Sequence, residues 1–237
     1  MSELAARQFA RVLIALQPYV DEIVFVGGWV HALYLAEAND SGAVMTEDID
    51  VTLPHTLLTR DRPTLLELAR DAGFERDPIS DMEEVAVWMV YRNADGLTVP
   101  IDFLTEGEPR RPVSIVGQPG LMAQGYPGQQ MLLQSWRWME VGTDVHALLD
   151  PPRRVRVPTL GAYVVQKAMS AAMRGHRGKA AKDYAYIADF GRSRSPISGE
   201  ADHLFRSKPI TRFGPSRSPV SVQADHSFRS KPITCFG

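Results

Sequence analysis

The chain has 237 residues, of which 44% are hydrophobic and 23% are charged, as in an ordinary globular protein. Its single cysteine, Cys235, excludes an internal disulfide and favours a reducing, cytoplasmic location. Charges interrupt the apolar positions of residues 1–22, which excludes a signal peptide or a membrane span there. We therefore expect a cytoplasmic protein without a membrane partner.

The net charge of −2 hides an uneven distribution. Residues 192–237 contain eight Lys/Arg and three Asp/Glu, which leaves 18 basic and 25 acidic residues in residues 1–191. An acidic body argues against broad binding of nucleic-acid phosphates by the folded part, although it does not exclude a local basic groove.

The first predicted elements are a helix, a strand and a second helix. Apolar spacing predicts a helix from Ser2, its expected N-cap, to about Gln17, with Pro18 at or just after its end. The run Glu22–Val26 predicts a buried strand. The Gly27–Gly28 pair then opens a segment with apolar residues at helical spacing.

Two more strands and a helix are predicted in the next part of the chain. Residues 46–53, "TEDIDVTL", alternate polar and apolar side chains as a strand does. Residues 62–74 predict a helix with Pro63 near its start and Gly73 as its C-cap. Residues 85–92 and 97–106, joined by "NADG", predict a β-hairpin.

The rest of the body is expected to end in helices. Residues 107–150, rich in Gly, Pro and Gln, support no firm assignment, and "RRVRVP" predicts a short strand. Residues 159–174 and 179–190 predict two helices. This order predicts an α+β (mixed α/β) fold with a small mixed β-sheet backed by helices. We divide the chain into a core (1–106), a mainly helical second half (107–190) and a tail (191–237).

The tail is a repeat. Residues 190–212 and 213–235 align without gaps and differ at only six positions. Each copy is rich in Ser, Arg and Pro, with too few apolar residues to bury a core, so we predict a disordered extension. It resembles translated repetitive DNA; a nucleic-acid-binding arm and a partner-binding tail are the alternatives.

Three carboxylates carry the strongest chemical signal. Asp48 and Asp50 leave the same face of their predicted strand, and Asp102 stands between the core-facing Ile101 and Phe103 on a later one. Three acids on one side of a sheet repel one another unless a cation lies between them, and Mg²⁺ prefers carboxylate oxygens. A solvated polar strand face is the alternative. Glycines where a strand turns into a helix let a phosphate approach backbone N–H groups.

Together, "FVGG", "EDIDVTL" and "IDFLTE" resemble the DNA polymerase beta-like nucleotidyltransferase superfamily, over residues 20–190. The resemblance implies transfer of an NMP group from an NTP to a hydroxyl acceptor, such as tRNA or a protein. It also implies two Mg²⁺ ions, with Mn²⁺ as the alternative, and Asp102 as the general base. The implied metal ligands and catalytic acids are Asp48, Asp50 and Asp102, and the implied phosphate-binding residues are Gly27 and Gly28.

The stretch at 163–190 resembles the helical half of the abortive-infection-toxin-like branch of that superfamily. This part of the resemblance implies a toxin–antitoxin setting and nucleotide contacts by Lys167, Lys182 and Asp183. A lysine there would offset triphosphate charge. The alternative is a surface Lys/Asp face on amphipathic helices.

The chain departs from the pattern at two places. Nineteen residues separate Gly28 from Asp48, so the connecting loop must be extended. Where the branch often continues as KDxxD, this chain has Tyr186, and its next acid is Asp189. Thr46, at the start of the acidic strand, has no predicted role.

Two rival functions remain open at this point. A catalytically inactive nucleotidyltransferase-fold protein with a binding or regulatory, antitoxin-like role would release no pyrophosphate. A plain α+β protein with solvated aspartates would show no thermal shift with Mg²⁺ and nucleotide. His31, His55, His146 and His176 lack ligand-type spacing and are predicted to be surface or core residues. The "WRWMEV" segment, with nothing basic around it except Arg137, predicts a strand or core patch rather than a base-stacking platform.

Overall fold

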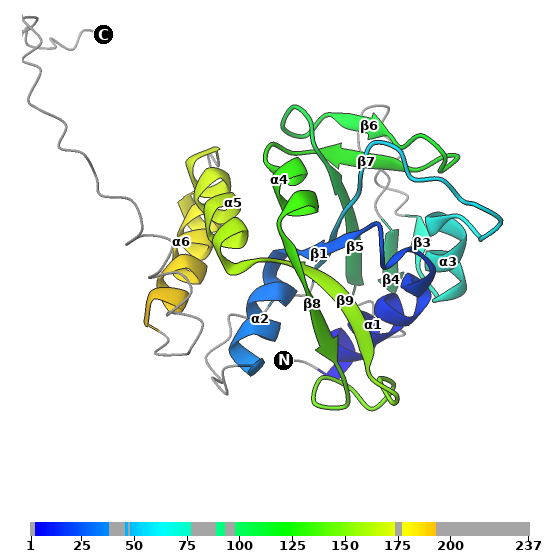
Figure 1. The fold of residues 1–237 in the computed structure, drawn as a ribbon, viewed down its shortest axis with the longest axis horizontal. Helices are drawn as coiled ribbons and strands as arrows, with labels where there is room; N and C mark the ends of the chain where they lie inside the picture. Colours follow the sequence, from blue (N-terminus) through cyan, green and yellow to red (C-terminus); the bar gives the residue numbers. More distant parts are fainter. Residues whose placement is uncertain are drawn as a thin grey trace, which may run out of the picture.

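The computed structural model describes residues 3–37, 46, 48–76, 89–92, 98–173 and 177–192. Its central mixed sheet has the path β1 (Val24–Val26), β2 (Ile49–Thr52), β5 (Thr98–Thr105), β4 (Met89–Arg92) and β3 (Glu75–Arg76) (Figure 1). Neighbours on this path are antiparallel, except β2 and β5, which are parallel. The sheet and its helices confirm the predicted α+β class.

Further strands extend this sheet and flank it. Strand β7 (Met122–Gly125) runs parallel to the end of β5 and pairs with β6 (Pro112–Ser114). Strands β8 (Trp136–Val141) and β9 (Arg153–Pro158) form a separate antiparallel pair, and β9 lies next to β1 (Figure 1).

One face of the central sheet carries the main core. Strand alternation turns Phe25, Val51 and Phe103 to this face, and all three are buried. They share one apolar cluster with residues of α1 (Glu3–Ala15), the 3-10 helix η1 (Gln17–Tyr19), α2 (Gly27–Glu37) and α3 (Leu65–Asp71). Phe9 of α1 stacks on Trp29 of α2 with ring centroids 4.0 Å apart. Truncating such a buried aromatic side chain to Ala costs about 3–5 kcal/mol, so these rings hold α1 and α2 together.

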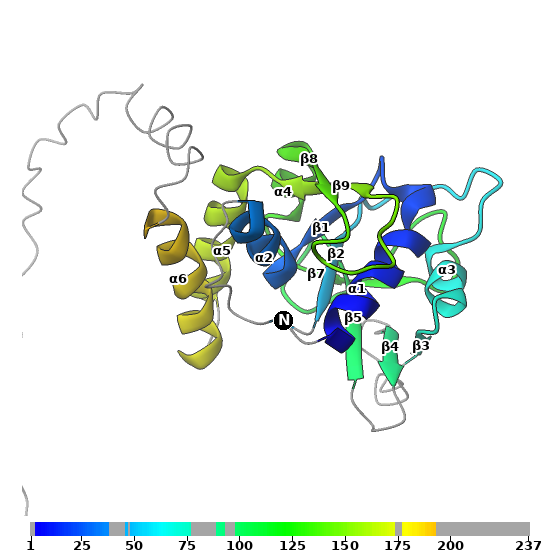
Figure 2. The ribbon, with the colours of Figure 1, turned by 90° about the horizontal axis from the view of Figure 1, so that it is seen from below.

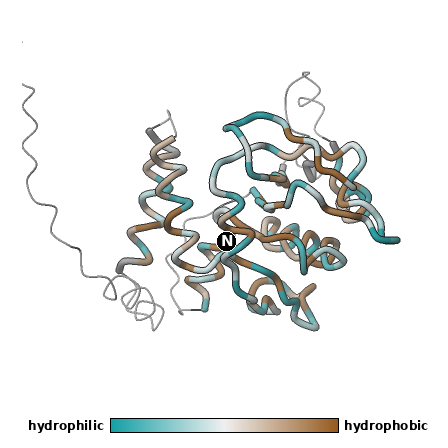
Figure 3. Tube along the Cα trace, turned by 45° about the horizontal axis from the view of Figure 1, so that its top comes forward, coloured by the Kyte–Doolittle hydropathy of each residue, from teal (hydrophilic) through white to brown (hydrophobic). Residues whose placement is uncertain are grey.

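The opposite face is only partly covered. Val24 and Val26 form a smaller cluster with Leu132 of α4 (Gln129–Gln134) and Ala162 of α5 (Leu160–Met173). Helix α6 (Arg177–Arg192) packs beside α5, and this helix pair lies at the end of the molecule opposite α3 (Figures 1 and 2). Figure 3 shows hydrophilic residues both along the helices and in the connecting loops at the edge of the molecule. In the described residues, none of the helices has the length and apolar character needed to cross a bilayer.

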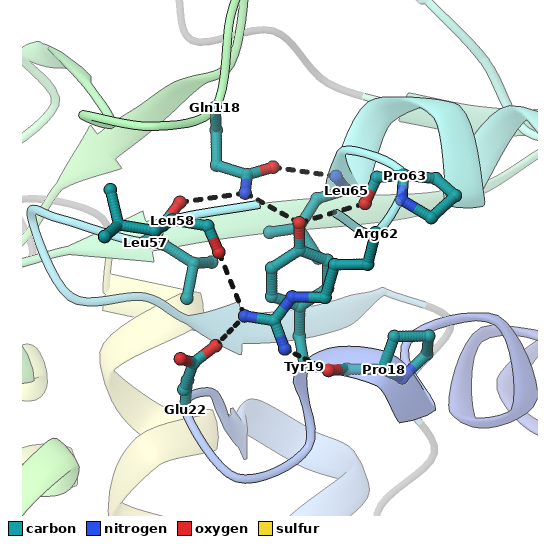
Figure 4. Close-up of polar contacts among 9 residues, drawn as sticks. All are labelled: Pro18, Tyr19, Glu22, Leu57, Leu58, Arg62, Pro63, Leu65 and Gln118. Atoms are coloured by element: carbon teal, nitrogen blue, oxygen red, sulfur yellow. Dashed lines mark hydrogen bonds and ion pairs between the residues drawn. The ribbon is translucent and has the colours of Figure 1, made fainter. Parts of the chain in front are cut away.

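A buried polar network anchors the loop that leads from β2 to α3 (Figure 4). The Gln118 amide nitrogen donates to the Tyr19 hydroxyl and to the Leu57 carbonyl, both at 2.9 Å. The Gln118 carbonyl oxygen accepts from the Leu65 N–H at 2.8 Å. The Arg62 guanidinium covers the Tyr19 ring at 3.6 Å. These hydrogen bonds hold the loop without a contribution from the acidic cluster.

Most predicted elements are present with shorter bounds. The first strand begins at Val24 because Glu22 belongs to the turn after η1, where its N–H donates to the Tyr19 carbonyl. The first helix is described from Glu3, so its predicted Ser2 cap lies outside the described residues. Strands β4 and β5 confirm the hairpin pairing, while residues 85–88 and 93–97 lie outside the described part.

Most of the elements that the sequence does not predict lie in residues 107–150. Residues 107–150 supply β6, β7, α4 and β8, and the predicted "RRVRVP" strand is β9. Helices α5 and α6 match the two predicted helices within a few residues. The division at 106 and 190 stays a prediction, and residues 193–237 of the tail lie outside the described residues.

Candidate active site

The turn between β1 and α2 needs glycine at two successive positions. Gly27 has φ +74°, a left-handed conformation that side chains other than glycine rarely adopt. A Cβ atom on Gly27 would lie 1.7 Å from Oδ2 of Asp50, and one on Gly28 would lie 2.6 Å from Cβ of Thr46. The glycine pair therefore lets the start of α2 press directly against the acidic strand.

Sheet register brings two of the acids together. Strands β2 and β5 are parallel and pair Asp50 with Asp102, so both side chains leave the same face. This is the partly covered face of the sheet, since Val26 of β1 pairs with Asp50. Asp48 directly precedes β2, and its carboxylate accepts a hydrogen bond from the Thr46 hydroxyl.

The three carboxylates form one cluster. Each offers an oxygen, and these oxygens lie within 4.8 Å of one another, with all three side chains half-buried. Like charges this close repel more strongly when partly removed from water. A hard divalent cation bound by carboxylate oxygens relieves this repulsion, and Asp48, Asp50 and Asp102 supply that donor set. The residues present therefore fit a Mg²⁺ or Mn²⁺ site.

A tyrosine from the helical half completes the turn. The Tyr163 hydroxyl, on α5, donates to the Gly27 carbonyl at 3.0 Å, and its side chain is buried. Burial is the main cause that raises the pKa of the Tyr163 phenol well above its ordinary value, and Tyr186, Asp50 and Asp183 raise it further. The phenol keeps its proton at neutral pH and acts as a donor. Because Tyr163 lies 136 positions after Gly27, no local sequence pattern links them.

The predicted helical contacts are held between α5 and α6. The Lys167 ammonium lies 3.5 Å from Oδ1 of Asp183, with both side chains buried. The Tyr163 and Tyr186 rings lie 5.4 Å and 5.2 Å from the same ammonium. Lys182 is half-buried, with its ammonium 5.7 Å from the Tyr186 ring. The structure thus pairs Lys167 with Asp183 and leaves Lys182 the more exposed of the two lysines.

The break in the KDxxD pattern on α6 places two residues, Tyr186 and Asp189, in contact with α2. Tyr186 is buried, and its ring lies 4.4 Å from the ring of His31 on α2. The Asp189 carboxylate lies 3.3 Å from Nε2 of His31. The sequence predicted either a core or a surface location for His31. The residue is fully buried, and it joins α2 to α6. The helical pair is therefore fastened to the helix that begins at the glycine turn.

The fold and these groups define a mixed-sheet protein with a glycine turn against a three-carboxylate cluster. The family model described as nucleotidyltransferase matches residues 5–192. The chain belongs to this nucleotidyltransferase family. No curated protein matches the chain.

Proposed function

We propose that the protein is a metal-dependent nucleotidyltransferase that moves an NMP group from an NTP to a hydroxyl acceptor. Family membership supports the transferase class, and the cluster of Asp48, Asp50 and Asp102 carries the metal dependence. When bound, Mg²⁺ or Mn²⁺ ions would neutralise charge on the triphosphate and lower the pKa of the acceptor hydroxyl.

The glycine turn and Asp102 have proposed roles in the transfer. Backbone N–H groups of Gly27 and Gly28, at the start of α2, bind phosphate oxygens because the first turn of a helix leaves such donors without helical acceptors. The acceptor oxygen forms a bond to the α-phosphorus, the bond to the β-phosphate oxygen breaks, and pyrophosphate leaves. The proton of the acceptor passes to the Asp102 carboxylate.

The helical half is proposed to complete the nucleotide site. Lys182 is the more exposed cation and offsets charge on the phosphates. The Lys167 ammonium pairs with Asp183 and lies near the Tyr163 ring, whose hydroxyl contacts the glycine turn. This buried pair is proposed to hold α5 and α6 together at the side of the nucleotide site.

Incubation with each α-labelled NTP, Mg²⁺, and total tRNA or total protein tests the function. The expected result is transfer of label from one NTP to one acceptor class, with release of pyrophosphate. Small hydroxyl compounds of the aminoglycoside type form the third arm. Nucleotide binding without pyrophosphate release in any arm would instead support the inactive, antitoxin-like alternative.

A matched variant separates this activity from contamination. Asp50→Asn removes one carboxylate from the cluster, whereas Asp71→Asn changes an exposed carboxylate on α3. We expect label transfer to disappear in the first variant and to persist in the second. Equal activity in both would contradict the site assignment.

A further inference from the structure

Tyr163 has no place in the predicted site, yet it makes a direct contact with the glycine turn. Its hydroxyl donates to the Gly27 carbonyl at 3.0 Å, and its side chain is only 1% exposed. The residue lies on α5, far from β1 in sequence, so this bond is a tertiary contact between the helical half and the sheet.

Peptide geometry gives this bond a consequence on the other side of the turn. A trans peptide is planar, and its C=O and N–H point in opposite directions. A hydroxyl that holds the Gly27 carbonyl toward α5 therefore directs the Gly28 N–H away from α5. The same bond also fixes Gly27, whose missing Cβ leaves the space that Oδ2 of Asp50 fills.

The Tyr163 ring is itself held from several sides. Phe190 of α6 meets it edge-on, with centroids 5.7 Å apart and an interplanar angle of 88°. The Lys167 ammonium lies 5.4 Å from the ring and is paired with Asp183 of α6. The position of the hydroxyl thus depends on how α5 and α6 pack together.

We propose that Tyr163 is a positioning residue through which the α5–α6 pair sets both the phosphate-binding Gly28 N–H and the seat of the Asp50 carboxylate. This inference rests on the proposed function, since it needs the cluster to bind a metal and the turn to bind phosphate. Tyr163 touches neither the nucleotide nor the acceptor in this scheme. It acts through Gly27.

Tyr163→Phe tests the role, because the variant keeps the ring and removes the hydroxyl. Tyr34→Phe is the matched control: Tyr34 is also 1% exposed, its hydroxyl donates to the Pro158 carbonyl at 2.7 Å, and its ring also meets Phe190 edge-on at 5.7 Å. Both variants lose one buried hydroxyl-to-carbonyl hydrogen bond. Only Tyr163→Phe loses a bond to the glycine turn.

Two probes are titrated into the full chain by calorimetry. Binding of Mn²⁺ alone reports whether the Asp50 carboxylate is correctly placed, and binding of Mn²⁺ with tripolyphosphate also reports the phosphate contact of the Gly28 N–H. We expect Tyr163→Phe to weaken binding of the second probe roughly 5- to 10-fold, the worth of about one hydrogen bond. The affinity of Tyr163→Phe for Mn²⁺ alone should fall by a smaller factor. Tyr34→Phe should bind both probes as the wild type does, with a similar loss of melting temperature.

Each outcome decides between the two levels of the inference. Wild-type protein that binds neither probe would overturn the proposed function and the role of Tyr163 with it. Wild-type binding with unchanged affinity in Tyr163→Phe would overturn the role of Tyr163 alone. Equal weakening in Tyr163→Phe and Tyr34→Phe would reduce the effect to general loss of stability and would also overturn that role.

Discussion

The Asp50 carboxylate occupies the space that a side chain at Gly27 would need, since a Cβ there would lie 1.7 Å from Oδ2. This contact joins the two strongest motifs of the sequence, the glycine pair and the acidic strand, in one structural unit. It also means that the glycine has a steric function beyond its left-handed φ of +74°.

Gly27→Ala is expected to damage both the fold and the metal site. A left-handed alanine costs about 1–2 kcal/mol, and displacement of Asp50 adds to this, so we expect a loss of roughly 2–4 kcal/mol in unfolding free energy. Urea denaturation measures the loss, and Mn²⁺ titration measures the site. Gly161→Ala is the control, because a Cβ there meets nothing within 4 Å. It should leave Mn²⁺ binding intact and stabilise α5 slightly. Equal effects of the two substitutions would contradict the steric role.

Asp48→Ala and Asp50→Ala should each abolish metal-dependent transfer and the stabilisation by divalent ions. A ligand at 100 times its dissociation constant stabilises the folded state by about 2.7 kcal/mol, which a melting curve with and without Mg²⁺ resolves. Asp71→Ala, on the exposed end of α3, should retain both properties. Full activity in either cluster variant would refute the assignment of the acids.

The Lys167–Asp183 pair should show strong coupling in a double-mutant cycle. Removing one partner leaves a buried charge uncompensated and costs about 3–5 kcal/mol. We therefore expect Lys167→Met and Asp183→Asn together to cost less than the two single losses added. Urea denaturation of the three variants measures the coupling energy.

The exposed pair Arg111–Glu108, at 2.6 Å, provides the comparison for this cycle. Its coupling should fall within about 0–1 kcal/mol, because both side chains are in water. A buried pair that couples no more strongly than this surface pair would show that Lys167 and Asp183 are not an energetic unit.

Helix α3 should report a pH-dependent cap. Thr64 and Glu67 form a capping box, in which the Glu67 carboxylate accepts from the Thr64 N–H at 2.7 Å. The backbone and side-chain hydrogen bonds from Thr64 lower the pKa of Glu67 below its ordinary value. The stabilisation is therefore present above the ordinary glutamate pKa of about 4.3 and is lost as pH falls through the lower folded value.

Thr64→Ala should lower the melting temperature at neutral pH, with a smaller difference from the wild type in acid. Glu67→Gln separates the charge from the cap, since Gln can still accept from the Thr64 N–H. This variant should keep the helix but lose the part of the pH dependence of stability that arises from ionisation of Glu67. If the difference in melting temperature between the wild type and Thr64→Ala stayed constant from pH 7 to below pH 4, the link between the Glu67 pKa and stability would be contradicted.

Strand alternation and glycine chemistry allowed much of the site to be predicted. The alternation of Asp48 and Asp50 with apolar residues, and the place of Asp102 between Ile101 and Phe103, predicted which face each acid takes. Local periodicity also predicted the two C-terminal helices. The weakest part was 107–150, where short strands and a six-residue helix are too brief to show a clear period.

The sequence by itself determined the polar and apolar faces of the strands, the glycine turn and the helical half, because each follows from residues that are near neighbours in the chain. Only the tertiary structure decided that β2 and β5 are parallel partners with Asp50 opposite Asp102. It alone placed the Tyr163 hydroxyl on Gly27. These contacts depend on sheet register and on helices packed from distant segments, and no local pattern encodes either.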